Sequence, residues 1–202
     1  MNDTKTVFVA PELQERIGLR APLVFAAATL VGFGFLYSLA GALLGGALFP
    51  AQAHGSLVGS GAHVVGSELV AQPFADAKYF QPRPSAANYD PMAAAGSNQA
   101  RSNPDLRARI EKTTAEVAAR DGIAPADVPK DLVTQSGSGL DPHISPEGAR
   151  VQVARVAKAR GVQAAEVQGI VDANTEGRQF GILGAPRVNV LRLNLALDAA
   201  RH

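Results

Sequence analysis

The chain has no cysteine and almost no excess charge. Without thiols it forms no disulfide, has no thiol nucleophile and builds no cysteine-ligated metal site. Lys and Arg number 19 against 18 Asp and Glu, which leaves a formal net charge of +1 over 202 residues. This nearly equal number of positive and negative residues indicates neither a nucleic-acid groove nor a polybasic membrane patch. Nucleic acid is therefore not expected as a partner.

Charge is also missing from residues 21–49, which contain no Asp, Glu, Lys, Arg or His. A bilayer-spanning helix needs roughly 20 mostly apolar residues, and lipid forces the backbone of a single span to be helical. The run therefore predicts one transmembrane helix, 21–49, between a tail (1–20) and a domain (50–202). Pro22 suits its first turn and Pro50 its exit.

A cleaved signal peptide is the alternative for this stretch. Ala51-Gln52-Ala53 resembles an A-x-A cleavage site, and Arg16 and Arg20 would form the positive region before the apolar run. The apolar region of a signal peptide is about 7–15 residues long, and this run is longer. Its length favours a retained anchor in contact with membrane lipid.

The distribution of Lys and Arg predicts the orientation of the span. Lys5, Arg16 and Arg20 precede the run, whereas no Lys or Arg occurs from Pro50 to Ala77. Positive residues near the ends of a span favour the cytoplasmic side. We therefore expect a cytoplasmic tail and an extracytoplasmic domain.

Small residues form a stripe within the span. Gly34, Ser38, Gly41 and Gly45 are spaced by three and four, and the last two form a GxxxG. Small residues let a second helix approach closely in lipid. On the pattern alone, a docking face and the ordinary composition of a membrane helix remain equally open.

After the span, the pattern predicts short strands among helices. Residues 53–66 are typical of a linker, Val64, Val65, Leu69 and Val70 indicate one or two strands, and 80–99 is rich in Pro and Asn and indicates an irregular loop. Caps and apolar spacing define three helices, a strand and a helix-or-strand segment: 102–122, 145–160, 163–174, 188–190 and 191–200. The domain is expected to be α/β or α+β, with a small sheet and three to four helices.

The segment 135–146 is polar and Gly-rich, and it is the natural place to look for chemistry. Ser136, Asp141 and His143 occur together in it, but neither a GxxxxGK[ST] loop nor a G-x-S-x-G elbow is present. A turn at Asp141 and a solvated loop histidine at His143 are the simpler interpretations. No catalytic residue is therefore expected.

The remaining titratable residues show no reactive pattern either. The four histidines lack metal-ligand spacing, so no metal site is expected: His54, His63, His143 and His202. Lys158 and Arg160 are expected on an outer, solvated helix face.

Ordered motifs over residues 21–198 resemble those of a known family. The most specific is the run 133–146, and further motifs include Phe49-Pro50, Tyr79-Phe80, Arg83-Pro84-Ser85-Ala86, Gly96-Ser97-Asn98, Arg155-Val156-Ala157, Val188-Asn189-Val190-Leu191 and Leu193-Asn194-Leu195-Ala196-Leu197-Asp198. Together they resemble the C subunit of the Kdp potassium-transporting P-type ATPase. The chain departs from that pattern in a longer tail before Arg20 and in Tyr37-Ser38, where a Tyr-Pro pair is usual.

The resemblance implies a non-catalytic, single-span subunit in the bacterial inner membrane, with its domain in the periplasm. Its partners would be a channel-like subunit that translocates K⁺ and an ATP-hydrolysing subunit. The family is described as a catalytic chaperone that raises the ATP affinity of the hydrolysing subunit. A domain outside the membrane cannot touch cytoplasmic ATP, so that effect would be allosteric.

On this reading the domain clamps the potassium entrance. The residues expected to face the partner or the entrance are Asn98, Asp131, Gln135, Ser136, Asp141 and His143. The alternative is an anchored or secreted periplasmic hydrolase or binding module that has no part in transport.

Overall fold

The computed structural model describes residues 18–60 and 63–200. The chain forms two compact units, 1–53 and 54–202, which are described separately below. All but the last three residues of the expected tail (1–20) lie outside the described residues.

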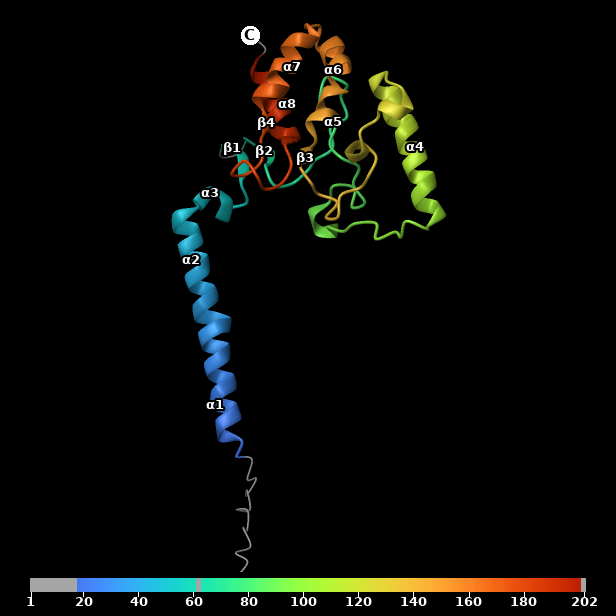
Figure 1. The fold of residues 1–202 in the computed structure, drawn as a ribbon. Helices are drawn as coiled ribbons and strands as arrows, with labels where there is room; N and C mark the ends of the chain where they lie inside the picture. The colour runs from blue at the N-terminus through green and yellow to red at the C-terminus, as the bar shows by residue number, and fades with distance from the viewer. Residues whose placement is uncertain (1–17, 61–62, 201–202) are drawn as a thin grey trace, which may run out of the picture. The chain divides into compact units, whose positions relative to one another are not determined.

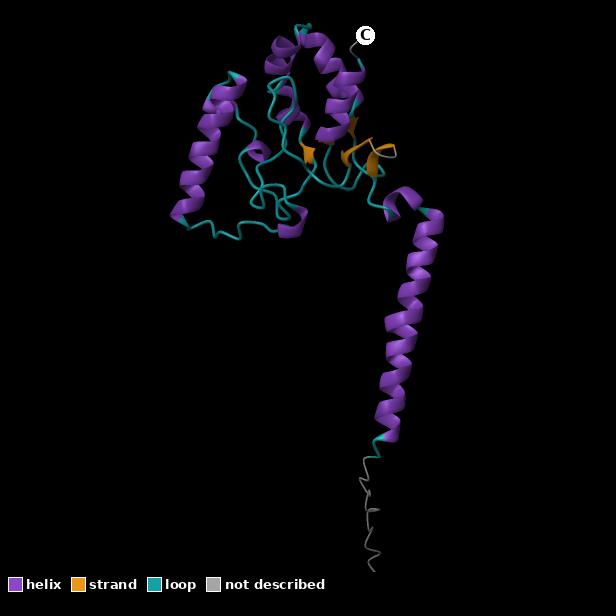
Figure 2. Cartoon of the chain, turned by 180° about the vertical axis from the view of Figure 1, so that it is seen from behind, coloured by secondary structure: helices purple, strands orange, loops and turns teal. Residues whose placement is uncertain are grey.

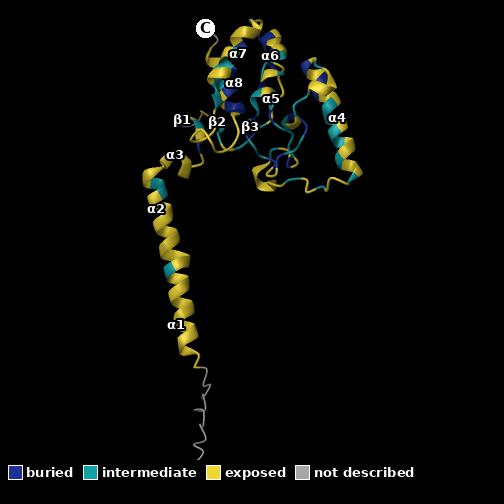
Figure 3. Ribbon diagram, viewed as in Figure 1, coloured by how far each residue is buried: buried dark blue, intermediate teal, exposed yellow. Residues whose placement is uncertain are grey.

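The first unit is one helix of 29 residues, Arg20–Leu48, followed by a short helix. It consists of α1 (Arg20–Thr29), a π-helical stretch (Leu30–Tyr37) and α2 (Ser38–Leu48), and then α3 (Pro50–Ala53) (Figure 1). None of the residues of α1, the π-helical stretch or α2 is buried (Figure 3). A helix that is apolar all round, and long enough to cross a bilayer, is the element expected for 21–49.

The second unit contains five short strands in two antiparallel sheets within its described residues (Figure 2). The first sheet pairs β1 (Leu57–Ser60) with β2 (His63–Ser67). The second has the order β3-β5-β4 and consists of β3 (His143–Ile144), β5 (Arg187–Asn189) and β4 (Thr175–Glu176). The strand expected at 188–190 is therefore confirmed, one residue earlier than expected.

Two expectations about the first sheet are wrong. The linker expected at 53–66 contains β1, which pairs with β2 despite its glycines and serines. Leu69 and Val70 lie in a turn instead of a strand. Their backbone N–H groups donate to Ser67, Leu69 to the hydroxyl and Val70 to the carbonyl, and this turns the chain out of the sheet.

Five α-helices lie in the described part of the domain, more than the three to four expected. They are α4 (Pro104–Asp121), α5 (Pro146–Arg150), α6 (Val153–Arg160), α7 (Ala164–Ala173) and α8 (Val190–Ala199). Caps fix their ends as expected. Asn103 and Ser145 accept hydrogen bonds from backbone N–H groups of α4 and α5, and Gly122 and Gly161 adopt the left-handed conformation after α4 and α6.

The single helix expected over 145–160 is wrong, because the chain turns at Val151-Gln152 between α5 and α6. The side chain of Gln152 is fully buried at this break. Its amide donates to the carbonyls of Gln81 and Gly148 and accepts from the N–H of Gln81. Residues 191–200 are helical, since Asn189 caps α8 by accepting from the N–H of Arg192.

The apolar core lies between the facing sides of α5 to α8 and the β3-β5-β4 sheet, where buried residues gather (Figure 3). Val156, Val167, Val188 and Leu193 are completely buried in it. The helices contribute buried apolar residues at 149, 153, 156, 167 and 171. Burial of this apolar surface is the main term that holds the domain together.

The segment 77–81, a turn that leads into the buried Phe80, pairs with no strand of the described residues. Side chains hydrogen-bond its backbone instead: Arg155, Arg160, Gln152 and Asn194. Asn194 alone satisfies both backbone groups of Phe80, with distances of 2.8 Å to the N–H and 3.0 Å to the carbonyl oxygen. Buried backbone groups must be paired, so these four side chains replace a neighbouring strand.

The solvated position expected for Arg160 is wrong, whereas Lys158 is exposed as expected. The side chain of Arg160 is 2% exposed and pairs with Asp198 at 2.8 Å. It also donates to the carbonyls of Lys78 and Leu197. Its burial follows from these partners, which lie far from it in sequence.

Replacing Asn194 by Leu should destabilise the domain strongly. The variant keeps an apolar side chain of similar size but leaves the N–H and the carbonyl of Phe80 buried and unpaired. Each such group costs about 1–3 kcal/mol, so a loss of about 2–5 kcal/mol is expected. Chemical denaturation of the full chain in detergent measures it. Gln168→Leu, which removes only a surface hydrogen bond to Asp172, is the control and should change stability by less than about 0.5 kcal/mol.

Candidate functional site

The loop 133–142 is the point at which distant segments of the domain meet. It follows the 3₁₀ turn Lys130–Leu132 and leads into β3. Hydrogen bonds join it to Ala71, Ser85 and Val190. The N–H of Ala71 donates to Leu140, the hydroxyl of Ser85 to Gly139, and the N–H of Val190 to Pro142. The loop is therefore held by three segments from different parts of the sequence.

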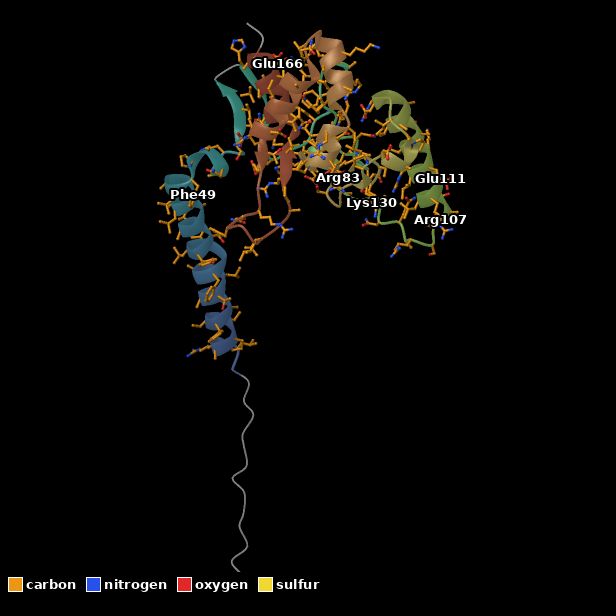
Figure 4. The ribbon with its side chains drawn as sticks, turned by 45° about the horizontal axis from the view of Figure 1, so that its top comes forward. Phe49, Arg83, Arg107, Glu111, Lys130 and Glu166 are labelled. Atoms are coloured by element: carbon orange, nitrogen blue, oxygen red, sulfur yellow. The ribbon has the colours of Figure 1, made fainter. Side chains whose placement is uncertain are left out.

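An ion pair fixes the C-terminal half of the 133–142 loop. Arg83 donates to Asp141 at 2.8 Å and to the carbonyl of Thr134 at 3.3 Å, and Nδ1 of His143 lies 3.4 Å from the Asp141 carboxylate. Arg83 lies near Lys130, the first residue of the 3₁₀ turn before the loop (Figure 4). Burial raises the pKa of Asp141, but hydrogen bonds from the side chain and backbone of His143 and from Arg83 outweigh burial and lower it to about 2. Asp141 is thus an anion that is neutralised by Arg83.

A second segment, 95–98, packs its backbone against the same loop. A Cβ added to Gly96 would lie 2.8 Å from the carbonyl oxygen of Gly137, and one added to Gly139 would lie 2.8 Å from that of Ala95. Gly139 also has a φ of +72°, which favours glycine. Both positions therefore need glycine, and the two segments form one continuous surface.

Apart from Ala95, the exposed part of this surface is polar and uncharged. Its other exposed residues are Ser97, Asn98, Gly137 and Ser138. Asn98 has a φ of +51°, a conformation that asparagine tolerates better than most residues. We call these four residues the polar surface. The polar surface presents hydrogen-bonding groups on a fixed backbone, which suits it to binding a partner.

The structure places the six residues expected at the partner-facing site as follows. Asp141 and His143 lie together, and Gln135 and Ser136 occupy the same loop but point inward. Ser136 is buried, and its hydroxyl has no hydrogen-bond partner among the described residues. The side-chain amide oxygen (Oε1) of Gln135 also has none among them. Asn98 lies on the neighbouring segment. Asp131 has a different task, since its carboxylate accepts from the N–H of Ser145 at the start of α5.

Arg83, Ser85 and Tyr89 are residues of this site that the sequence did not single out. Ser85 accepts from the N–H groups of Ala87 and Tyr89, and the Tyr89 hydroxyl donates to the carbonyl of Arg83. These bonds fold 83–89 into a compact turn against the loop. The motif Arg83-Pro84-Ser85-Ala86 was the available signal, since it lies in a Pro-rich segment with no apolar periodicity.

The site shows recognition chemistry and no assembled reactive group. His143 faces Asp141, and Ser136 receives no hydrogen bond from it. In residues 18–60 and 63–200 no three His, Asp or Glu side chains come together as metal ligands would. What the arrangement can do is offer hydrogen bonds from a rigid surface.

A groove of about 540 Å³ lies between α4 and α6, away from this loop. Alanine and glycine form most of its wall: Ala77, Ala119, Ala154, Ala159 and Gly122. The buried Asp121 binds Arg155 at 2.7 Å and Arg120 at 2.6 Å, and Lys158 also lines the groove. The groove therefore combines small side chains with an excess of positive charge.

The stripe of small residues lies on the helix of the first unit. Ser38, Gly41 and Gly45 fall within α2, where the α-helical spacing puts them on one face. Gly34 lies in the π-helical stretch, whose wider turns shift it relative to α2. No side chain of the described chain lies within 4 Å of a Cβ added to Gly41 or Gly45. The face is open to another helix.

One apolar N-terminal helix and a small α+β domain with a rigid hydrogen-bonding surface define a helix-bearing accessory or binding protein. The chain belongs to the KdpC family, since the family description "K+-transporting ATPase, c chain" matches residues 19–199.

Relatives agree across nearly the whole chain, and each is named "Potassium-transporting ATPase KdpC subunit". The protein of Xanthomonas oryzae pv. oryzae is 64% identical over 188 residues, which cover 93% of this chain and 90% of the relative. That of Shewanella putrefaciens is 52% identical and covers 92% of both chains. That of Kineococcus radiotolerans is 50% identical, with 93% and 94% covered. The family resemblance is confirmed, and the alternative of an unrelated hydrolase or binding module is not favoured.

The low pKa of Asp141, which hydrogen bonds from His143 and Arg83 produce, should make stability depend on pH in a defined window. The folded pKa of Asp141 is about 2, below its ordinary value of 3.8, so its contribution is complete above pH 4 and is lost as pH falls toward 2. The shift corresponds to about 2 kcal/mol. Denaturation of the full chain from pH 5 to 2 should therefore show a steeper loss for the natural chain than for Asp141→Asn.

The control for this experiment is Asp127→Asn, which removes a carboxylate that makes no ion pair with the described residues. It should leave the slope between pH 4 and 2 unchanged. Equal slopes for Asp141→Asn and the natural chain would contradict a stabilising role of the pair.

Proposed function

We propose that this chain is the accessory subunit of an ATP-driven potassium-uptake pump, and that its domain clamps the potassium entrance of a channel-like subunit. Its relatives carry the name of a potassium-transporting ATPase subunit. The observation that carries the clamp role is the convergence of three sequence motifs, 83–86, 96–98 and 133–146, on the polar surface. K⁺ is the cargo of the complex.

The domain lies in the periplasm in this proposal. Arg20 and the positive residues of the tail precede the span, and the next basic residue after it is Lys78. This asymmetry favours an N-terminus in the cytoplasm and a single pass through the bacterial inner membrane. The potassium entrance of an uptake pump opens on the periplasmic side, where the domain would then be.

Rigidity is what suits the polar surface to a clamp. Its loop is fixed by the Arg83–Asp141 pair, by Ser85 and by the close approach of two backbones at Gly96 and Gly139. A surface that is already ordered loses little conformational entropy when it binds. Uncharged groups at its tip would also leave the electrostatic path of an entering cation undisturbed.

In this proposal the domain affects ATP binding only indirectly. A periplasmic domain has no contact with cytoplasmic nucleotide, so a higher ATP affinity of the hydrolysing subunit requires two conformations of the complex that the clamp binds unequally. The effect is limited by that difference in binding, typically 1–3 kcal/mol. By reciprocity, bound ATP would tighten the clamp by the same factor.

The helix supplies a second contact, through the face that carries Ser38, Gly41 and Gly45. Close approach of backbones at small residues is how helices associate in lipid. Anchoring and docking then reside in one element. The hydrolysing or the channel-like subunit is the expected neighbour.

Cross-linking tests the clamp directly, because the chain has no native cysteine. Ser97→Cys and Gly137→Cys place thiols on the polar surface, and a Cβ at Gly137 meets no atom within 4 Å. Short bifunctional reagents should join both to the channel-like subunit in the assembled complex.

The control is Glu166→Cys on α7, which is exposed and lies away from Arg83 and Lys130 (Figure 4). It should give little product with that subunit. Cross-links formed only with the nucleotide domain of the hydrolysing subunit would overturn the clamp and its periplasmic location.

Replacing Gly41 and Gly45 by Ile should weaken assembly while the chain still inserts in the membrane. Both sites are free of clashes within the chain, so any loss must come from a neighbouring helix. The matched control is Ala40→Ile with Ala47→Ile, which adds bulk on another face of α2. Co-purification of the three subunits measures the effect. Equal yields from the two double variants would make the helix a tether only.

A further inference from the structure

The loop between β4 and β5 carries three exposed large apolar side chains, two of which, Phe180 and Ile182, are the most exposed of the described domain apart from Met92. Phe180 is 84% exposed, Ile182 75% and Leu183 54%. Single exposed apolar residues are ordinary, but three within four positions form a patch that marks a binding surface. Neither the ion pairs nor the polar surface described above involves these three side chains.

Backbone hydrogen bonds give this loop a defined conformation. Gln179 and Leu183 exchange two backbone hydrogen bonds of 2.9 Å, which close a tight turn over residues 180–182. Phe180 has a φ of +55°, a conformation that a bulky aromatic residue rarely adopts. Gly181 and Gly184 also have positive φ. The backbone thus holds Phe180 and Ile182 at an exposed tip, although a positive φ is unfavourable for phenylalanine.

An arginine lies on each side of the tip in the sequence, Arg178 before it and Arg187 after it. Arg187 pairs with Glu176 at 2.8 Å, whereas the guanidinium of Arg178 makes no hydrogen bond or ion pair with any residue that the structure describes. An apolar tip with a free guanidinium beside it matches the interfacial layer of a bilayer, where the tip meets acyl chains and arginine meets lipid phosphate.

The sequence keeps this domain close to a bilayer. Five residues separate Leu48, the last of the span, from His54, the first of the domain. An extended chain covers at most about 3.5 Å per residue, so the tether is no longer than about 20 Å. The β1-β2 hairpin follows at once and exposes Leu57, Val64 and Val65.

Ion pairs of Arg192 link the hairpin to the base of the loop. Arg192 binds Glu68, which follows β2, at 2.6 Å, and approaches Glu176 at the base of the loop at 3.6 Å. The short tether therefore limits the distance of the loop from the membrane as well.

We propose that the loop 178–187 is an interfacial anchor, whose Phe180, Ile182 and Leu183 enter the outer layer of the bilayer while Arg178 binds lipid phosphate. The proposal rests on the proposed function only in requiring that Arg20–Leu48 span a membrane. It adds a lipid contact that would fix the tilt of the domain above the membrane.

Tryptophan fluorescence tests the anchor cleanly, because the chain contains no tryptophan. Phe180→Trp is made in the full chain and reconstituted into vesicles of zwitterionic lipid with and without anionic lipid. Lipids brominated on their acyl chains serve as the quencher. Met92→Trp, at a residue 93% exposed elsewhere in the domain, is the control.

The expected result is a blue-shifted emission that brominated lipid quenches for Phe180→Trp, with no quenching for Met92→Trp. Arg178→Gln should reduce the quenching most in anionic vesicles. Ile182→Trp repeats the measurement in case Phe180→Trp folds poorly. Flotation with the vesicles reports separately whether the helix has inserted.

Two results would overturn the anchor. One is an absence of lipid quenching at positions 180 and 182 in chains that float with the vesicles. The other is a blue shift that appears only when the other pump subunits are present and that brominated lipid leaves unchanged, since the loop would then dock on protein. Failure of the helix to insert would instead count against the proposed function.

Discussion

The domain depends on the hydrogen bonds that side chains make to the backbone of the segment 77–81. This segment has no strand beside it, so Gln152, Arg155, Arg160 and Asn194 satisfy its backbone groups. These residues come from α6, from α8 and from the turn before α6, so the segment ties those elements together. It continues directly into Arg83, and its fixed path brings that guanidinium to Asp141. The polar surface is therefore held in place by the same buried bonds.

Local rules predicted those parts of the fold whose cause lies within a few residues. Asn103 and Ser145 begin helices, and Gly122 and Gly161 end them, because capping involves only neighbouring backbone groups. The buried polar side chains that were missed depend on distant partners. Gln152 and Arg160 are buried because of the 77–81 segment, some 70 to 80 residues earlier. Periodicity within a helix contains no information about such contacts.

The candidate site divides in the same way. The motifs identified the segments that meet, since 83–86, 96–98 and 133–146 were all recognised in the sequence. They could not show that Arg83 neutralises Asp141, because the two are 58 residues apart, nor that Ser136 points inward. The sequence shows glycine at 96 and 139, but not why glycine is needed there. The reason is the close approach of the backbones of 95–98 and 133–142, which exists only in the folded domain. Family resemblance motivated the proposed role, and geometry identified the exposed residues.

A tethered clamp needs little affinity of its own. When one contact of a two-contact binder is formed, the second becomes intramolecular, with an effective concentration in the millimolar range for a short linker. Here at most five residues join the span to the domain, so docking of the helix would hold the polar surface near its target. A small uncharged surface could then engage and release as the pump changes conformation, because weak binding leaves neither state too stable. A lipid contact at the 178–187 loop would add orientation to proximity. Distance, tilt and recognition would thus reside in three separate elements, each of which can be altered without unfolding the others.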